Sequence, residues 1–421
     1  MTMNKEIIKT IIADFHKRGL PDFIQRETKI PLDTGKIITL VGARRAGKTY
    51  SMYQLMSEIK DITDIIYINF EDERLQLDLE NLNTIIEAYF ELYPKKTEKQ
   101  VYFFFDEIQE MKGWEKFVRR IYDTVSKKIF LTGSSAKMLH KEIATSLRGR
   151  TINFEILPLS FYEFLKFKKT SLDIISTKGK AYISGLFKSY LQKSSFPETI
   201  NMPDFIIEKT LRTYFDVMLY RDIIDRYQIS NVIALKYLMK KLLMNTAKEF
   251  SIHKIYNELK SRGIRISKDT LYKLVNYFED AYIIFQVQNF SQSINNQTQK
   301  KAYTIDQGLS TILSFTLSED VGRLLESIVY LELKRRYSEI FYYKDKGECD
   351  FILKEKSKIT QAYQVCAYIT DDNKNREFTG LTKAMEKFHL KRGVIITLNQ
   401  KKTEGKIEII PAYEWMLTKN I

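Results

Sequence analysis

Residues 42–49 have the types and the spacing that bind a phosphate chain. They read Gly-Ala-Arg-Arg-Ala-Gly-Lys-Thr, which fits the pattern G-x-x-x-x-G-K-[ST]. An apolar run, 37–41, precedes them, and a stretch with helical spacing, 50–60, follows. In such a loop the glycines let backbone N–H groups close around phosphate oxygens, and the N-terminus of the following helix favours negative charge. The segment therefore predicts a phosphate-binding loop, or P-loop.

The P-loop pattern gives a role to each of its polar side chains. We expect Lys48 to reach the β- and γ-phosphates of ATP and the Thr49 hydroxyl to ligate Mg²⁺. ATP and Mg²⁺ are therefore the expected cofactors. The residues expected to contact the nucleotide are Gly42, Ala43, Arg44, Arg45, Ala46, Gly47, Lys48, Thr49 and Tyr50.

A second chemical feature is an apolar run, 101–105, that ends in two carboxylates, Asp106 and Glu107. In open α/β sheets, ligands bind at the carboxyl edge where such strands end. We expect Asp106 to hold Mg²⁺ through water and Glu107 to polarise the attacking water as a general base. The alternative, solvated loop acids after a core strand, is disfavoured by the P-loop upstream.

Hydroxyl groups follow the next apolar run, 129–131. We favour Ser134 as the residue that holds the attacking water, with Ser135 as second choice, although either could equally be the N-cap of a helix.

Arginine residues follow farther along the chain. An arginine supplied to a neighbouring nucleotide can accelerate hydrolysis by about 10³–10⁵. Of Arg148 and Arg150 we favour Arg150 for this role, and a role in trans would require an oligomer; a surface pair without function is the alternative.

Apolar runs separated by helix-length stretches must position these groups. The runs are 37–41, 65–70, 101–105, 129–131 and 152–157. Short apolar runs that alternate with helices predict a parallel sheet covered on both faces, an α/β fold. Residues 160–250 read as mainly helical, and 318–421 return to mixed α/β, with boundaries expected near 160, 225 and 316.

The amino-acid composition limits the kinds of protein and of binding partner to expect. The net charge is +14, from 67 Lys and Arg against 53 Asp and Glu, which favours a polyanion such as DNA as partner. A lysine-rich composition that serves only solubility is an equally good reading. We find no apolar run of about 18 residues, so no membrane span is expected. The N-terminus lacks the apolar core of a secretory signal, and the two cysteines suit a reduced, cytoplasmic setting.

Taken together, the segments GARRAGKT, FFFDEIQ, LTGSS, LRGR and LPLSFYEFL resemble AAA-type ATP-binding proteins of bacteria and archaea that carry a C-terminal domain of unknown function. Later motifs extend the resemblance over nearly the whole chain. They are Phe196-Pro197-Glu198, Tyr220-Arg221-Asp222, residues 322–326, 348–351, 376–378 and 410–415. Ser194 and Ser195 depart from the family, which usually has two glycines before Phe-Pro-Glu.

The resemblance implies a fold for each part of the chain. It implies a RecA-like AAA+ core with a parallel sheet in an αβα sandwich, a helical lid, a winged helix-turn-helix and a restriction-endonuclease-like α/β tail. The expected ranges are 1–160 for the core, 161–225 for the lid, 226–315 for the winged helix and 316–421 for the tail.

Residues 251–306 also read as a helix-turn-helix followed by a wing. Ser251 and Ser267 are placed to cap two helices, 252–260 and 268–282, and strands are expected at 283–290 and 300–305. Such modules read DNA, but many serve only as protein docking modules, and both interpretations stay open. The candidate DNA contacts are Lys254, Arg262, Arg265, Lys268, Tyr272, Lys273 and Asn276.

The tail holds its acidic residues in the order of a metal-dependent nuclease. Glu326 on a helix, Asp350 on a strand and Gln364 on the next strand would form the core of the site. Such sites need two carboxylates for a divalent ion and a lysine that supports the attacking water. Cys366 stands where the lysine is expected, and Lys344 and Lys346 belong to the wrong strand. We therefore expect a folded relic that serves docking or assembly.

Three functions are compatible with these features. The first is an oligomeric, Mg²⁺-dependent ATPase that remodels or moves along duplex or branched DNA. The second is an ATP-dependent signalling switch in which the winged helix docks an unknown protein partner. The third is an ATP-regulated nuclease, which Cys366 disfavours.

Overall fold

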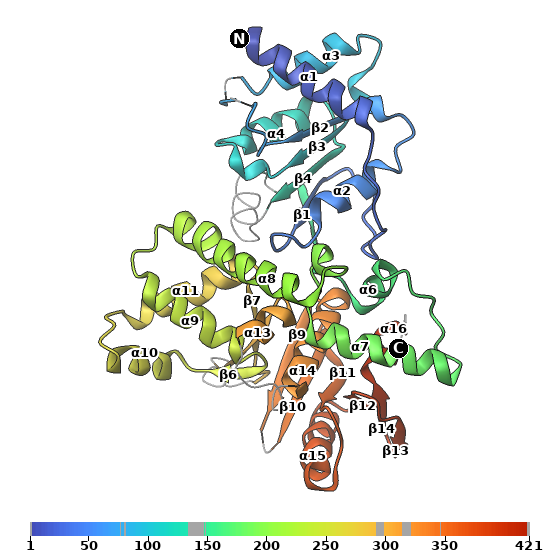
Figure 1. Ribbon diagram of the computed structural model, residues 1–421, viewed down its shortest axis with the longest axis vertical. Helices are drawn as coiled ribbons and strands as arrows, with labels where there is room; N and C mark the ends of the chain where they lie inside the picture. The colour runs from blue at the N-terminus through green and yellow to red at the C-terminus, as the bar shows by residue number, and fades with distance from the viewer. Residues whose placement is uncertain are drawn as a thin grey trace. The chain divides into compact units, whose positions relative to one another are not determined.

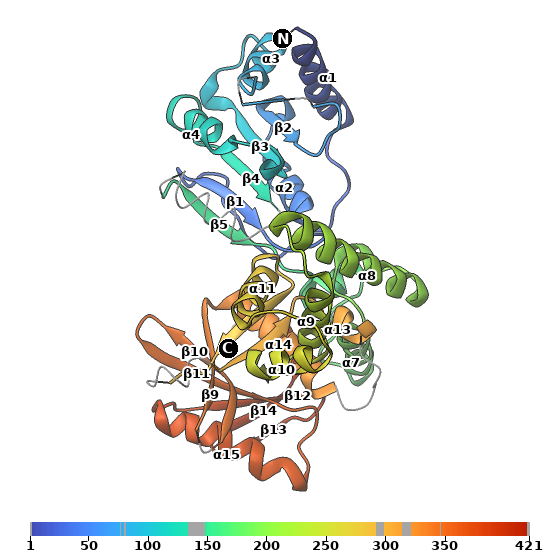
Figure 2. The same ribbon diagram turned by 90° about the vertical axis from the view of Figure 1, so that its left-hand side faces the viewer.

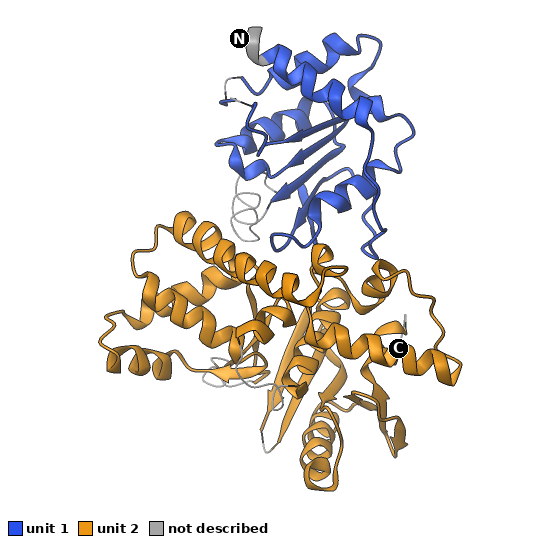
Figure 3. Cartoon of the chain, in the orientation of Figure 1, with its two compact units in different colours: residues 1–156 blue, residues 157–421 orange. Residues whose placement is uncertain are grey.

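The computed structural model describes residues 2–75, 77–79, 81–133, 147, 149–291, 299–313, 321–345 and 347–418. Contacts divide the chain into two compact units, Met1–Ile156 and Leu157–Ile421 (Figure 3). Within the described ranges, no helix is both long and apolar enough to span a bilayer.

Unit 1 is built on a parallel five-stranded sheet with the order β2-β3-β4-β1-β5 (Figure 1). Its strands are β1 (Ile37–Val41), β2 (Ile65–Asn69), β3 (Tyr102–Asp106), β4 (Ile129–Gly133) and β5 (Thr151–Glu155). Each strand lies within two residues of an apolar run that the sequence singled out, so the predicted parallel α/β sheet is confirmed.

Helices cover both faces of this sheet. The helices are α1 (Thr2–Arg18), α2 (Lys48–Met56), α3 (Thr84–Leu92) and α4 (Trp114–Thr124). The chain crosses the sheet in one direction from β1 to β2 and in the opposite direction from β3 to β4. Because crossovers between parallel strands are right-handed, α2 and α4 fall on opposite faces (Figure 2). Helix α2 ends four residues before the expected residue 60, where the Ser57 N–H bonds back to the Tyr53 carbonyl.

The centre of the sheet is aromatic. Phe103, Phe104 and Phe105 are fully buried although successive side chains of a strand point to opposite faces. Phe104 stacks on Phe130 of β4 with ring centroids 4.5 Å apart. A strand buried on both faces is held firmly, and β3 therefore delivers Asp106 and Glu107 to a fixed place at the sheet edge.

Unit 2 begins with helices. They are α6 (Phe161–Phe167), α7 (Thr177–Gln192), α8 (Asp204–Leu219), a π-helix (Tyr220–Asp225) and α9 (Val232–Met244). After α7, the buried Asp306 carboxylate accepts hydrogen bonds from the Ser195 N–H at 2.6 Å and from the Ser194 and Ser195 hydroxyls. Ser194 and Ser195 therefore hold a buried carboxylate at the place where the family resemblance led us to expect two glycines.

A small antiparallel sheet, β6-β8-β7, follows in unit 2. Its elements are β6 (Lys248–Phe250), α10 (Ile252–Ser261), α11 (Lys268–Asp280), β7 (Ile284–Gln288), β8 (Lys300–Thr304) and α13 (Gln307–Leu313). The Ser251 and Ser267 hydroxyls accept the N–H groups of Lys254 and Thr270, so both predicted N-caps are confirmed. The short β6 was not predicted.

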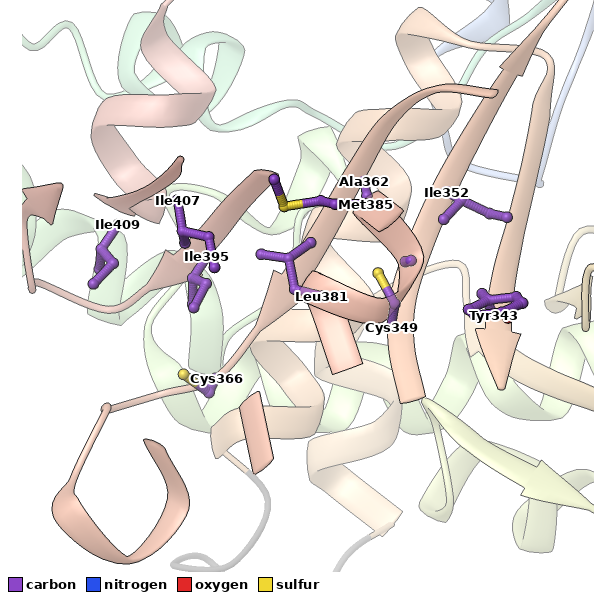
Figure 4. Packing of buried hydrophobic residues seen from close by; sticks show 11 residues of the cluster. Tyr343, Cys349, Ile352, Ala362, Cys366, Leu381, Met385, Ile395, Ile407 and Ile409 are labelled. Carbon is purple, nitrogen blue, oxygen red and sulfur yellow. The ribbon is translucent and has the colours of Figure 1, made fainter. Parts of the chain in front are cut away.

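The rest of unit 2 is a six-stranded mixed sheet with the order β13-β14-β12-β11-β10-β9. Its elements are α14 (Val321–Arg336), β9 (Glu339–Lys344), β10 (Glu348–Glu355), β11 (Lys358–Val365), α15 (Asp371–Lys387), β12 (Gly393–Thr397), β13 (Lys402–Glu404), β14 (Ile407–Pro411) and α16 (Ala412–Leu417). Leu381 and Met385 of α15 pack over strand side chains, and Cys349 and Cys366, both buried and free, belong to the same core (Figure 4).

Candidate nucleotide site

The loop between β1 and α2 has a backbone that only glycine adopts easily. Gly42 has φ of +154°, and a Cβ placed on it would lie 2.2 Å from the Ile156 carbonyl oxygen. Gly47 has φ of +98° and forms the left-handed N-cap of α2. Its carbonyl accepts the Ser51 N–H at 3.0 Å, which closes the first turn of the helix. The loop therefore approaches β5 closely and opens directly into a helix N-terminus, as the P-loop pattern predicts.

Lys48 is folded back into this loop. Its side chain is buried, and its Nζ donates to the Gly42 carbonyl at 3.2 Å and to the Ala43 carbonyl at 3.1 Å. The Glu107 carboxylate lies 3.9 Å from the same ammonium. The predicted cation and the predicted general base thus lie at one end of the sheet.

Asp106 is surrounded by hydroxyl groups. Thr49 donates to Oδ2 at 2.8 Å, Tyr67 donates to Oδ2 at 3.1 Å, and Thr132 donates to Oδ1. Burial raises the pKa of the Asp106 carboxyl, and the hydrogen bond from Thr132 opposes that shift. The predicted pair of Mg²⁺ ligands, Thr49 and Asp106, is therefore in direct contact.

Glu107 leaves the strand through an unusual backbone conformation. Its φ is +49°, in the left-handed region that non-glycine residues rarely adopt. The Glu107 N–H donates to the Thr132 Oγ1 at 2.9 Å, and Gln109 Nε2 donates to the Glu107 carboxylate at 2.6 Å. These contacts fix the turn and aim the carboxylate toward Lys48, since the turn alone would be strained.

Three residues of this site escaped prediction. Thr132 was read only as part of a strand end, yet it contacts both Asp106 and Glu107. Tyr67 belongs to an apolar run of β2. Arg26 is buried and donates from Nη1 to the Ala46 carbonyl of the P-loop at 2.8 Å. Only Thr132 carried a signal in the sequence, because it is the first hydroxyl residue after the apolar run 129–131. Arg26 precedes the first strand and fits no motif.

The other predicted nucleotide residues differ in exposure. Ala43 and Ala46, which belong to the loop itself, are fully buried. Arg44 lies 3.7 Å from Glu71, and Arg45 is exposed with φ of +67°. Tyr50 is 51% exposed, which leaves its ring accessible beside the start of α2.

Arg150 lies away from these groups. Ile37 pairs with Thr151 at the start of the parallel strands β1 and β5, and the P-loop follows their far end. Arg150 precedes β5, so it is at the opposite edge of the sheet, where its Nε donates to Asp123 at 3.1 Å. It does not reach the P-loop of its own unit. Ser134, Ser135 and Arg148 lie outside the described residues.

The candidate DNA contacts of unit 2 are exposed, and all lie on or beside α10 and α11. They are Lys254, Arg262, Arg265, Lys268, Tyr272, Lys273 and Asn276. Two of them also contact rings: Arg262 lies over Tyr237 at 4.9 Å, and Lys268 lies over Tyr256 at 5.3 Å.

The tail residues singled out by sequence also come together. Gln364 Oε1 accepts the Asp350 N–H at 3.3 Å, and Asp350 Oδ1 and Glu326 Oε1 both contact Lys301, which the sequence did not single out. Lys344 pairs with Glu249 at 2.9 Å and lies 3.8 Å from the Glu348 carboxylate. Lys346 is among the residues not described.

Comparison with protein families gives two matches. Residues 34–165 match the family described as AAA domain, and these residues contain the P-loop and Asp106–Glu107. Residues 184–320 match a domain of unknown function, DUF8612.

Similar proteins span nearly the whole chain. The uncharacterized protein MJ1544 of Methanocaldococcus jannaschii is 40% identical and covers 94% of this chain and 91% of its own length. An uncharacterized protein of Haemophilus influenzae is 28% identical, and the match covers 91% of this chain and 95% of that protein. Among solved structures, the Walker-type ATPase PABY2304 of Pyrococcus abyssi aligns with a TM-score of 0.43 and 15% identity over 66% of this chain and 90% of its own. That likeness is too distant to carry a functional argument.

Proposed function

The chain belongs to the same family as MJ1544 and carries an AAA domain, and on this premise we propose that unit 1 binds ATP and hydrolyses its β–γ bond with Mg²⁺. The observation that carries the proposal is the contact between Thr49 and Asp106 at the end of the P-loop, 2.8 Å between oxygens. A hydroxyl and a carboxylate that lie this close, beside a loop rich in N–H donors, are the donor set that Mg²⁺ with phosphate requires.

The residues present fit both ligands. Thr49 and Asp106 offer the oxygen atoms that a hard cation prefers, and bound Mg²⁺ would neutralise charge on the phosphate oxygens. Among the residues that the structure describes, the partners of the Lys48 ammonium are two carbonyl oxygens and a carboxylate 3.9 Å away. Phosphate oxygens would replace these with stronger, charge-assisted hydrogen bonds. We assign Lys48 and the loop N–H groups to charge stabilisation.

Glu107 is the proposed base for the attacking water. Its carboxylate accepts a hydrogen bond from Gln109 and its N–H donates to Thr132, so contacts within the chain hold it in position. We keep Ser134 as the residue that helps to hold this water. A general base contributes about 10²–10⁴ in rate, which sets the scale of the effect expected from its loss.

Matched variants test the P-loop assignment. Lys48→Ala should abolish binding of a fluorescent ATP analogue in the presence of Mg²⁺, while thermal unfolding shows a folded protein. Lys60→Ala removes an exposed lysine that follows the same helix and should bind normally. Equal binding by both variants would remove Lys48 from the site.

We further propose that the hydrolysis serves work on DNA by an oligomer. The order α9, β6, α10, α11, β7, β8 with β6 paired to β8 supports a winged helix. Lys268, Tyr272, Lys273 and Asn276 lie on the exposed face of α11, the position of a recognition helix. The net charge of +14 supports a polyanionic partner. Since Arg150 lies at the wrong edge for its own nucleotide, its proposed role is in trans.

DNA-stimulated turnover tests this use. Duplex and branched DNA should raise the ATPase rate. The affinity for DNA that underlies this stimulation should fall by almost one logarithmic unit per phosphate contact for each tenfold rise in salt concentration. Lys268→Ala/Lys273→Ala should lose stimulation but keep basal turnover. The control, Lys178→Ala/Lys180→Ala, removes the same charge from exposed sites on α7.

A signalling switch is the second candidate. The rings beneath Arg262 and Lys268 favour it, because basic side chains that already lie over Tyr237 and Tyr256 have less freedom to reach phosphates. Turnover indifferent to DNA, together with a change of oligomeric state on ATP binding, would make the winged helix a protein docking module.

A further inference from the structure

Lys301, from the middle of the small sheet, inserts its ammonium among the carboxylates of the tail. Its Nζ lies 2.9 Å from Glu326 Oε1, 3.1 Å from Asp350 Oδ1 and 2.7 Å from Glu348 Oε1. Lys301 is 3% exposed, and Glu326 and Asp350 are 8% and 5% exposed. The lysine comes from β8, whereas the carboxylates come from α14 and β10, so separate elements of unit 2 meet at this cluster.

The cluster is satisfied by the chain itself. The Tyr303 hydroxyl donates to Glu326 Oε1 at 2.7 Å, and the Val365 N–H donates to Asp350 Oδ2 at 2.9 Å. Each deep carboxylate therefore has Lys301 and one further donor. Among the residues described, no group of three or more His, Cys, Asp and Glu side chains is arranged to hold a metal ion.

Electrostatics keeps Lys301 charged. Burial lowers the pKa of its ammonium, but the carboxylates of Glu326, Asp350 and Glu348 outweigh burial and raise that pKa well above its usual value. A buried carboxylate pair without a cation would be strongly unfavourable. The lysine offsets part of that cost, since burial and the neighbouring Glu326 carboxylate still raise the pKa of Asp350 to about 8.

We infer that the Lys301 ammonium is a built-in cation that occupies the place between Glu326 and Asp350 where a divalent ion would otherwise bind. The ion pairs of this cluster thereby link the small sheet to the six-stranded sheet. A metal-dependent phosphodiester reaction needs an ion with open coordination positions for water and phosphate. In this cluster the Lys301 ammonium, held by three carboxylates, occupies the place of that ion, so we assign the cluster a structural role in place of nuclease chemistry. The inference is independent of ATP hydrolysis in unit 1.

Terbium luminescence tests this inference on the nucleotide-free, full-length protein. Tb³⁺ binds oxygen sites that accept divalent ions, and the Tyr303 ring beside Glu326 would sensitise an ion bound there. The wild type and Asp350→Asn should give the same titration, because the cluster takes no ion and the P-loop contributes equally to both. Lys301→Ala should gain a Tyr-sensitised site of at least about a hundredfold higher affinity, since a unit positive charge has left the cluster. Lys300→Ala, the neighbouring lysine on β8, should behave as wild type.

Two results would overturn the inference. One is a Tb³⁺ or Mn²⁺ site in the wild type that Asp350→Asn removes, together with Mn²⁺-dependent DNA cleavage lost in the same variant. The other is a folded Lys301→Ala that binds no more Tb³⁺ than Lys300→Ala. If Lys301→Ala does not fold, Lys301→Met/Glu326→Gln/Asp350→Asn, which removes all the deep charges, should recover the fold. If that triple variant also fails to fold, a purely ionic role of Lys301 is contradicted. The comparison of the wild type with Asp350→Asn decides whether the cluster binds a metal ion without need of the Lys301 variants.

Discussion

The Thr132 hydroxyl should be needed for ATP turnover but not for ATP binding. It donates to Asp106 Oδ1 and accepts the Glu107 N–H at 2.9 Å, so it links the proposed metal ligand to the proposed base. Thr132→Val keeps the shape of the side chain and removes both hydrogen bonds. Because Thr132 is fully buried, no water can replace the hydroxyl without disturbing the sheet.

The magnitude follows from the kind of bond that is lost. A hydrogen bond to a charged group contributes about 1.5–3 kcal/mol. If that amount is lost from the transition state, the turnover number falls about 10- to 100-fold, since about 1.4 kcal/mol corresponds to a factor of ten. The affinity for ATP should change little, because the P-loop N–H groups and Lys48 are untouched.

Steady-state hydrolysis with saturating ATP and Mg²⁺, paired with equilibrium binding of an ATP analogue, measures both quantities. Thr132→Ser keeps the hydroxyl and should restore most of the turnover. The reasoning is refuted if Thr132→Val turns over at the wild-type rate, or if Thr132→Ser is as slow as Thr132→Val, since a merely steric role would then explain the site.

Further predictions concern the loop, the stability of unit 1 and the assembly. Gly42→Ala should lose nucleotide binding and more than about 1 kcal/mol of stability, because its Cβ would lie 2.2 Å from the Ile156 oxygen; Gly185→Ala, in open space on α7, should be harmless by the same thermal melts. Burial lowers the pKa of His16, whose Nε2 bonds the Ile65 carbonyl and whose Nδ1 bonds the Tyr93 hydroxyl. The unfolded chain therefore binds the proton first, and stability should fall as pH drops below about 6.5. His16→Gln should flatten that slope between pH 7.5 and 5.5, and an unchanged slope would exclude His16 as its source. If Arg150 acts in trans, Arg150→Ala mixed with Glu107→Gln should regain part of the turnover that each lacks alone; no recovery in mixed oligomers would argue against that role.

Local pattern was enough to predict the strands of unit 1. The apolar runs at 37–41, 65–70 and 101–105 are short, bounded by polar residues and buried on both faces, and such runs have few alternatives to a parallel strand. The P-loop was predictable because glycine is required locally at two positions. Gly47 has a positive φ, and Gly42 has a positive φ and approaches the Ile156 backbone closely.

Contacts between distant residues were not predictable in the same way. Thr132 contacts Asp106 only because β4 lies beside β3, and strand order is not encoded in any single segment. Lys301 reads as one lysine among many, and its burial depends on the meeting of β8 with α14 and β10. The sequence therefore identified the carboxylates Glu326 and Asp350 but did not identify Lys301 as the cation between them. The short strands β6 and β13, with three residues each, carry too little pattern to stand out.

Arg150 shows the limit of a motif read without its register. Its position after the hydroxyl-rich strand end suggested a place near the nucleotide. The register of β1 and β5 instead puts it at the start of both strands, and its guanidinium contacts Asp123. A catalytic role in its own unit is therefore incompatible with the sheet, and only the role toward a second copy remains as a proposal.

The most direct test of the account is ATP hydrolysis by Glu107→Gln, measured beside the wild type with binding of an ATP analogue as the second readout. The amide keeps the size of the side chain but cannot act as a base. The account predicts normal ATP binding, loss of turnover by about 10²–10⁴, and no effect of Mg²⁺ concentration on the residual rate beyond saturation. Two results would contradict the assignment of Glu107 and of the site built around Asp106 and Lys48. One is turnover at the wild-type rate in Glu107→Gln, and the other is a loss of ATP binding as large as the loss of turnover.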